Sequence, residues 1–225
     1  MEYAGYEFIN EGTASVRVKL GKLSTPVWIQ QRWSGIDHPH SGFVVRNGCG
    51  HCCAAMAVTM YSHPIDPLAE YNLCRELWGA PNEVVTPGGK TGEGNFQSAM
   101  GITKIIRHFG ISAECFGVPS TDEARARIEG ALSLGKQVIF CVRPTSEEHP
   151  HPFSRGWHWV MAVGYTEGGK ILVANSSEPH SEAGVQEVSI DVILDALCIG
   201  SEPADLRWGV WSEDFRTGTG YIIVG

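Results

Sequence analysis

The spacing of apolar residues predicts helices over much of the first part of the chain. Residues 49–61 (CGHCCAAMAVTMY) are apolar on nearly every side, which is typical of a helix buried all round. Three further segments combine apolar residues at helical spacing with a capping residue before them and a glycine after them. These segments run from Asp66 to Gly79, from Asn95 to Gly110 and from Ser120 to Gly135.

Later in the chain the pattern changes to short apolar runs of the kind that form strands. The runs are rich in β-branched and aromatic residues, lie between Gly or Pro residues, and comprise Gln137–Val142, Trp157–Tyr165 and Lys170–Asn175. The sequence TEGGK between the last two runs predicts a hairpin turn. A further helix is predicted at Ser189–Cys198 and a closing strand at Gly218–Gly225.

This order of elements indicates an α+β fold, with helices gathered early and an antiparallel sheet gathered late. No repeat or long linker divides the chain, so we expect a single domain over residues 1–225. Its helical lobe is expected at about 45–135 and its sheet lobe at about 136–225. Two long loops, 80–94 and 143–156, connect these elements, and long loops in a compact domain are often functional.

Composition and charge narrow the classes of function. A chain of 225 residues can bury a core without a metal or a disulfide to hold it, and we expect no cofactor. The net charge of −8, with scattered basic residues, argues against a nucleic-acid partner. No apolar run reaches the ~20 residues of a membrane span, and the first residues lack a signal-peptide pattern. The chain has seven cysteines, and this odd number fits reduced thiols better than a set of disulfide bonds. We therefore expect a cytoplasmic protein. The sequence does not predict the oligomeric state.

The strongest candidate for chemistry is Cys49, which stands where the buried helix begins. The turn residues Asn47 and Gly48 precede it, so the first backbone N–H groups of the helix should point at its sulfur. A helix N-terminus can lower the pKa of a thiol, and the same donors can stabilise an oxyanion beside it. Gly50 leaves the approach of a substrate open. We therefore predict that Cys49 is a nucleophile.

A general base for this nucleophile is predicted at the start of a strand. His158 opens the run HWVMAVGY, and Asn175 ends the next strand across the hairpin turn. A hairpin brings two such strands side by side, so the amide oxygen of Asn175 could accept the second N–H of the His158 ring. The order Cys, His, Asn along the chain is that of papain-like enzymes.

Together these motifs resemble those of the bacteriocin-processing (double-glycine leader) peptidases and their free-standing papain-like relatives. In that family the nucleophile lies in Gly-Cys-Gly followed by Ala-Met, and the base lies in His-apolar-Val-x-x-x-Gly-Tyr. The first pattern matches here at Gly48, Cys49, Gly50, Ala55 and Met56. The second matches at His158, Trp159, Val160, Gly164 and Tyr165. The match covers about Pro26 to Leu197 and implies a papain-like fold, with the nucleophile helix packed on the sheet.

The resemblance also implies two further site residues. The third catalytic residue of the family follows the next strand, usually as Asp-Pro, and maps to Asn175 and Ser176. An oxyanion donor comes from a glutamine upstream of the nucleophile, for which Gln30 is favoured over Gln31. This chain departs from the family in its longer connection over residues 31–48 and in having no transporter segments after the peptidase region.

The predicted function is therefore that of a cysteine peptidase acting on a peptide or protein through a Cys-His-Asn triad and a thioester intermediate. The family implies cleavage after a small residue such as Gly. Trp157 and Trp159 flank the predicted base, and we expect them to line the substrate cleft. Two alternatives use the same fold: a transferase or amide-forming enzyme that passes the thioester to another acceptor, and a binding module without turnover.

Other interpretations of the cysteines remain open at this point. Cys49 could be a structural thiol, or it could form a redox pair with Cys52. A zinc site built from Cys49, His51, Cys52 and Cys53 is a further alternative, although the cluster lacks a second pair of ligands. The remaining cysteines are predicted to be core thiols, namely Cys52, Cys53, Cys74, Cys115, Cys141 and Cys198.

Overall fold

The computed structural model describes residues 2–78, 84–85, 91–92, 99–177, 184–197 and 220–225. The chain begins with a three-stranded antiparallel sheet of β1 (Ala4–Glu11), β2 (Ala14–Leu20) and β3 (Leu23–Trp28). Alternate residues of β2 are buried, as expected of a strand with one face on the core. The sequence pattern predicted helices before strands, so this N-terminal sheet corrects the predicted order of elements.

The helices that follow surround one buried helix, α2 (Cys49–Tyr61), in which ten of 13 residues are buried. It is preceded by the 3₁₀ turn η1 (Gln30–Trp33) and α1 (Ser41–Asn47), and followed by α3 (Pro67–Trp78) and α4 (Ala99–His108). The predicted cap of α3 is confirmed, because Asp66 Oδ1 accepts hydrogen bonds from the N–H groups of Leu68 (2.9 Å) and Ala69 (2.8 Å). The predicted cap Asn95 lies outside the described residues.

A six-stranded antiparallel sheet forms the centre of the molecule, in the strand order β10-β9-β8-β7-β11-β6. The three predicted strand runs correspond to β7 (Gln137–Val142), β8 (His158–Tyr165) and β9 (Ile171–Ala174), and the predicted closing strand to β11 (Tyr221–Val224). The hairpin between β8 and β9 is confirmed by the bond from Thr166 N to Lys170 O (2.7 Å). Four strands were not predicted from the sequence: the edge strands β6 (Ala113–Phe116) and β10 (Val185–Val188), and the short pair β4 (Val84–Val85) and β5 (Thr91–Gly92).

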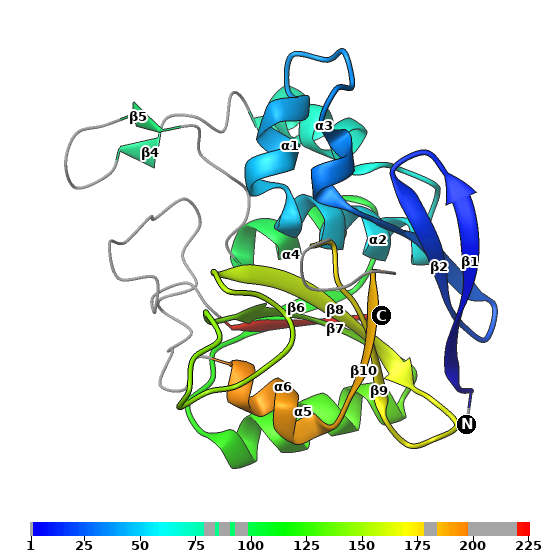
Figure 1. The fold of residues 1–225 in the computed structure, drawn as a ribbon, viewed down its shortest axis with the longest axis vertical. Helices are drawn as coiled ribbons and strands as arrows, with labels where there is room; N and C mark the ends of the chain where they lie inside the picture. The colour runs from blue at the N-terminus through cyan, green and yellow to red at the C-terminus, as the bar shows by residue number, and fades with distance from the viewer. Residues whose placement is uncertain (1, 79–83, 86–90, 93–98, 178–183, 198–219) are drawn as a thin grey trace.

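Helices cover both faces of this sheet (Figure 1). The helices α2 and α4 pack on one face, whereas α5 (Thr121–Ser133) and α6 (Ile190–Ala196) pack on the other. The strands divide their side chains accordingly, so that Ile139 joins the first core and Phe140 the second. The helices of the predicted helical lobe therefore lie on both faces, and α2 approaches the face that carries the side chain of Trp159.

Among the helices of the described residues, none combines the length and the apolar character that crossing a bilayer requires. This agrees with the absence of a long apolar run from the sequence.

Candidate active site

The structure places Cys49 at the first residue of α2, with a half-buried thiol at the edge of the main core. Burial raises the pKa of this thiol to about 11, although backbone hydrogen bonds from Trp159, Gly50 and Cys49 itself act in the opposite direction. The helix N-terminus therefore does point its first N–H groups at the sulfur, but burial outweighs them. The expected lowering of the thiol pKa is wrong: Cys49 is protonated at neutral pH and needs a base to become a nucleophile.

The junction between α1 and α2 sets the position of Cys49, and it requires glycine at residue 48. A Cβ added to Gly48 would lie 2.4 Å from Val44 O and 2.8 Å from Val44 Cα. The backbone of Val44 cannot move away easily, because Gly48 N donates to Val44 O at 2.9 Å. The short connection that places the sulfur at the start of α2 thus depends on the missing side chain.

We expect Gly48→Ala to lower the free energy of unfolding by about 1–3 kcal/mol, the usual cost of overpacking. Gly130→Ala in α5 is the matched control, because a Cβ there meets nothing within 4 Å. In the interior of a helix that control should stabilise the protein by about 0.5–1 kcal/mol. Urea unfolding followed by circular dichroism measures both changes, and effects of the same sign would contradict this account of the junction.

His158 and Asn175 lie together at the ends of neighbouring strands. Both side chains are buried, and His158 Nε2 is 2.9 Å from Asn175 Oδ1. Because the amide oxygen can only accept, Nε2 carries the proton and donates it to this bond. In a neutral imidazole the other nitrogen, Nδ1, then has the lone pair that can accept a proton. This geometry is the one that a histidine base held by an amide requires.

The amide of Asn175 is itself fixed in orientation by four hydrogen bonds. Its Nδ2 donates to Phe153 O (3.0 Å) and to Gln186 Oε1 (3.1 Å), while its Oδ1 accepts from Ser177 N (3.0 Å) as well as from His158. The amide group of Gln186 is held in turn, since its Nε2 donates to Pro152 O at 2.8 Å. The loop before β8 and the edge strand β10 thus fix the side chain of Asn175, which in turn orients the ring of His158.

The sequence did not predict a role for Gln186 or for the contacting loop residues Pro152 and Phe153. The contact with Gln186 arises because β10 pairs with β9 beside Asn175, whose N–H donates to Gly184 O at 2.8 Å. No local pattern in the sequence marks the partner of a strand, so nothing in the sequence pointed to this glutamine.

Gln30 lies beside the same segment. Its backbone N–H donates to Ser176 O at 2.9 Å, which ties the start of η1 to the residue after Asn175. The side chain is buried, and Gln30 Oε1 has no hydrogen-bond partner among the described residues. Ser176 also lies next to the thiol of Cys52, one helical turn after Cys49. Gln30 is therefore held close to the start of α2 through its backbone, and Gln31 is only half-buried.

The backbone of β8 connects these groups to the sulfur. The N–H of Trp159, which bonds to the Cys49 thiol, belongs to the residue that follows His158. Trp159 is 4% exposed and its side chain is part of the main core, so little of its ring is open to a substrate. Its contribution to the site is its backbone N–H. Trp157 is half-buried against the same core, and Gly50 is buried.

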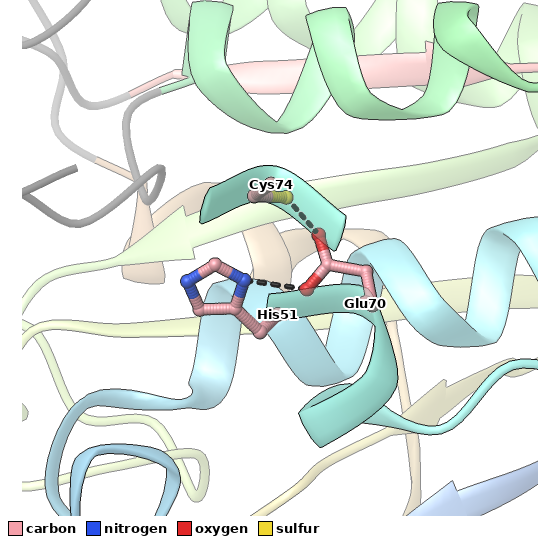
Figure 2. Close-up of side chains that lie close together, drawn as sticks. All are labelled: His51, Glu70 and Cys74. Carbon is pink, nitrogen blue, oxygen red and sulfur yellow. Dashed lines mark hydrogen bonds and ion pairs between the residues drawn. The ribbon is translucent and has the colours of Figure 1, made fainter. Parts of the chain in front are cut away.

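The alternative zinc set of Cys49, His51, Cys52 and Cys53 does not assemble. Cys52 and Cys53 are fully buried, and burial raises the pKa of both thiols well above the ordinary value. In the part of the chain that the structure describes, the metal-ligating side chains that gather are those of His51, Glu70 and Cys74 (Figure 2). The remaining cysteines follow the prediction of core thiols, except that Cys115 is half-buried and Cys198 lies outside the described residues.

Comparisons with known proteins add little to this geometry. No protein-family model matches the sequence, and no curated protein matches it. Among solved structures, one similar chain is described as the "Crystal structure of an putative C39-like peptidase from Bacillus anthracis". It is 12% identical, with a TM-score of 0.47 over 80% of this chain and 89% of the other. A likeness of this size leaves the activity to be argued from the residues of the chain itself.

Proposed function

We propose that this protein is a cysteine peptidase that cleaves a peptide amide bond, with Cys49 as nucleophile and His158 as general base. The observation that carries the proposal is the 2.9 Å hydrogen bond from His158 Nε2 to Asn175 Oδ1. The residue after His158 on the same strand, Trp159, donates its backbone N–H to the Cys49 thiol. A buried imidazole in a fixed tautomer beside a thiol at a helix N-terminus is the arrangement of an activated nucleophile.

The reaction begins with transfer of the Cys49 Sγ proton to His158 Nδ1. The sulfur then attacks the carbonyl carbon, and the electron pair of the C=O bond moves onto the oxygen. The tetrahedral intermediate collapses by breaking the C–N bond, and His158 returns the proton to the departing amine. Water attacks the resulting thioester by the same route and releases the acid and the free thiol. The resemblance to bacteriocin-processing peptidases favours a small residue such as Gly before the cleaved bond.

The raised pKa of Cys49 determines when the thiol proton is transferred in the proposed reaction. A thiol with a pKa of about 11 is not a resting thiolate, so the proton must leave as the substrate binds. Asn175 supports this step in two ways, because it fixes the tautomer of His158 and stabilises the imidazolium that forms. The four hydrogen bonds to the Asn175 amide keep that partner in place.

Gln30 is proposed to donate from its side-chain amide to the oxyanion, together with the backbone N–H of Cys49. We expect Gln30→Ala to reduce kcat by about 10²–10³-fold with little change in KM, because the lost hydrogen bond forms only in the transition state. Gln31→Ala is the matched control and should leave kcat within about twofold. Steady-state kinetics on one cleaved peptide measures both variants, and equal losses would exclude a special role for Gln30.

The function itself is tested by incubating the protein with a defined mixture of peptides and identifying the products by mass spectrometry. We expect new carboxyl termini at small residues. Repeating the reaction with hydroxylamine traps the acyl group, so hydroxamates at the same positions would show that a thioester forms. A protein that yields acyl adducts but no free acids would be a transferase, and one that yields neither product would count against an enzyme.

A further inference from the structure

A second group of chemically active side chains lies away from the proposed triad, between α2 and α3 (Figure 2). His51 Nδ1 is 2.5 Å from Glu70 Oε2, and Cys74 Sγ donates to Glu70 Oε1 at 3.1 Å. Their exposed fractions are 1%, 0% and 1% for His51, Glu70 and Cys74. The carboxylate therefore turns one oxygen towards each of the other two groups, in a region without contact to water.

Burying three ionisable groups is costly, and the hydrogen bonds within the cluster do not fully offset that cost. The second ring nitrogen, His51 Nε2, is buried and finds no hydrogen-bond partner among the described residues. The His51 ring instead packs edge to face against two aromatic rings. Its centroid is 5.0 Å from that of Tyr71 and 5.8 Å from that of Phe43. An apolar set of similar volume would avoid both the desolvation of the charges and the unpaired nitrogen. The cluster therefore calls for a role beyond packing.

We propose that His51, Glu70 and Cys74 form a structural zinc site. A neutral imidazole nitrogen, a carboxylate and a thiolate are all ligands that Zn²⁺ prefers, and a mixed N, O and S set disfavours Mg²⁺ and Ca²⁺. Bound in this way the ligands carry two negative charges in total, which one Zn²⁺ ion neutralises. Binding releases the proton of the Cys74 thiol, and the ion takes the place of the hydrogen bond between His51 Nδ1 and Glu70 Oε2.

The geometry needs only small adjustments to hold the ion. The three ligand atoms lie within 4.8 Å of one another. Zn–N, Zn–O and Zn–S bonds of about 2.0–2.3 Å in a tetrahedron place ligand atoms about 3.3–3.8 Å apart. Side-chain rotations that move the ligand atoms by about 1 Å would lengthen the distance between His51 Nδ1 and Glu70 Oε2 and bring Cys74 Sγ closer to the ion. If Glu70 binds through both oxygens, which lie closer together than two corners of a tetrahedron, the three side chains give four ligand atoms in a distorted arrangement.

The positions of the ligands on the helices say what such an ion would do. Glu70 and Cys74 are one turn apart on α3, whereas His51 is in the first turn of α2, two residues after Cys49. The ion would join α3 to the start of the helix that positions the proposed nucleophile. Its expected effect is on stability, since a ligand that binds the folded state alone stabilises it by mass action.

The test is metal content, which does not depend on peptidase activity. Protein is purified from cultures supplemented with zinc chloride, dialysed against metal-free buffer and measured by inductively coupled plasma mass spectrometry. We expect about one zinc per chain in the wild type and in Cys49→Ala, which separates this site from the proposed triad. Cys53→Ala, which removes a buried thiol of α2 outside the cluster, should also keep the metal.

Cys74→Ser should lose most of the zinc, because its hydroxyl can still donate to Glu70 but is a poor ligand for the ion. Protein loaded with cobalt in place of zinc gives a second readout, a thiolate-to-cobalt charge-transfer band that should be present in the wild type and absent from Cys74→Ser. Glu70→Gln should bind less metal as well. Wild-type protein free of zinc and of the cobalt band, or Cys74→Ser with wild-type metal content, would overturn the proposal.

Discussion

Replacing Cys49 with alanine is expected to reduce kcat by about 10⁵-fold or more while leaving the protein folded. The reason is chemical rather than structural. The sulfur is the atom that bonds to the substrate carbonyl in the proposed reaction, and its side chain lies only at the edge of the main core. We expect the free energy of unfolding to change by less than about 1 kcal/mol. Turnover of a cleaved peptide and urea unfolding measure the two effects on the same preparation.

Cys53→Ala provides the opposite pattern and is the control for this variant. Cys53 is fully buried in α2, so its truncation should cost about 1 kcal/mol of stability and leave kcat nearly unchanged. A Cys49→Ala protein that keeps more than about 1% of the wild-type rate would contradict a covalent mechanism at this residue.

Replacing His158 with alanine is expected to reduce kcat by about 10⁴-fold. Without the imidazole nothing accepts the thiol proton, and burial still raises the pKa of Cys49, so the reactive thiolate is rare at neutral pH. The loss should shrink as the pH rises, because the thiol then deprotonates without help. Kinetics at several pH values, in the wild type and the variant, measure this difference.

His149→Ala is the matched control for that experiment. His149 lies in the loop before β8, where its backbone N–H donates to Ser146 Oγ at 3.1 Å, and the proposed mechanism gives its ring no part. Its removal should leave kcat within about twofold at every pH. If His149→Ala lost as much activity as His158→Ala, the assignment of His158 on β8 as the general base would be contradicted.

Those parts of the fold that depend on local chemistry followed from the sequence. The cap of α3 at Asp66 and the start of α5 at Ser120 were predicted, because a capping side chain bonds to its own helix. The hairpin between β8 and β9 was predicted for the same reason, as its turn residues are contiguous. The N-terminal sheet was not predicted, although alternate residues of β2 are buried.

The parts that depend on packing between distant segments did not follow from the sequence. The sequence predicted the strand β8, but not that α2 and the core cover the side of the sheet that the side chain of Trp159 faces. The support of Asn175 by Gln186 depends on which strand pairs with β9. The pKa of Cys49 was expected to be lowered, whereas burial raises it. The start of a helix can be predicted from the sequence, but the depth at which its first residue is buried cannot.

The contact between His51 and Glu70 belongs to the same class, since it depends on how α2 packs on α3. The sequence instead drew attention to the adjacent cysteines Cys52 and Cys53, which share a short segment with His51. Helical geometry turns both thiols into the core.

The rate at which iodoacetamide alkylates Cys49, followed by peptide mapping across a range of pH, tests the central claim most directly. In the wild type His158 accepts the thiol proton as the sulfur attacks the reagent, so we predict alkylation of Cys49 in the neutral range although its thiol rests protonated, and Cys49 should react before every other thiol. In His158→Ala nothing accepts that proton, so the same reaction should become appreciable only at alkaline pH, because burial raises the pKa of the Cys49 thiol. Superimposable profiles for the two proteins would contradict the account, because Cys49 would then react without His158.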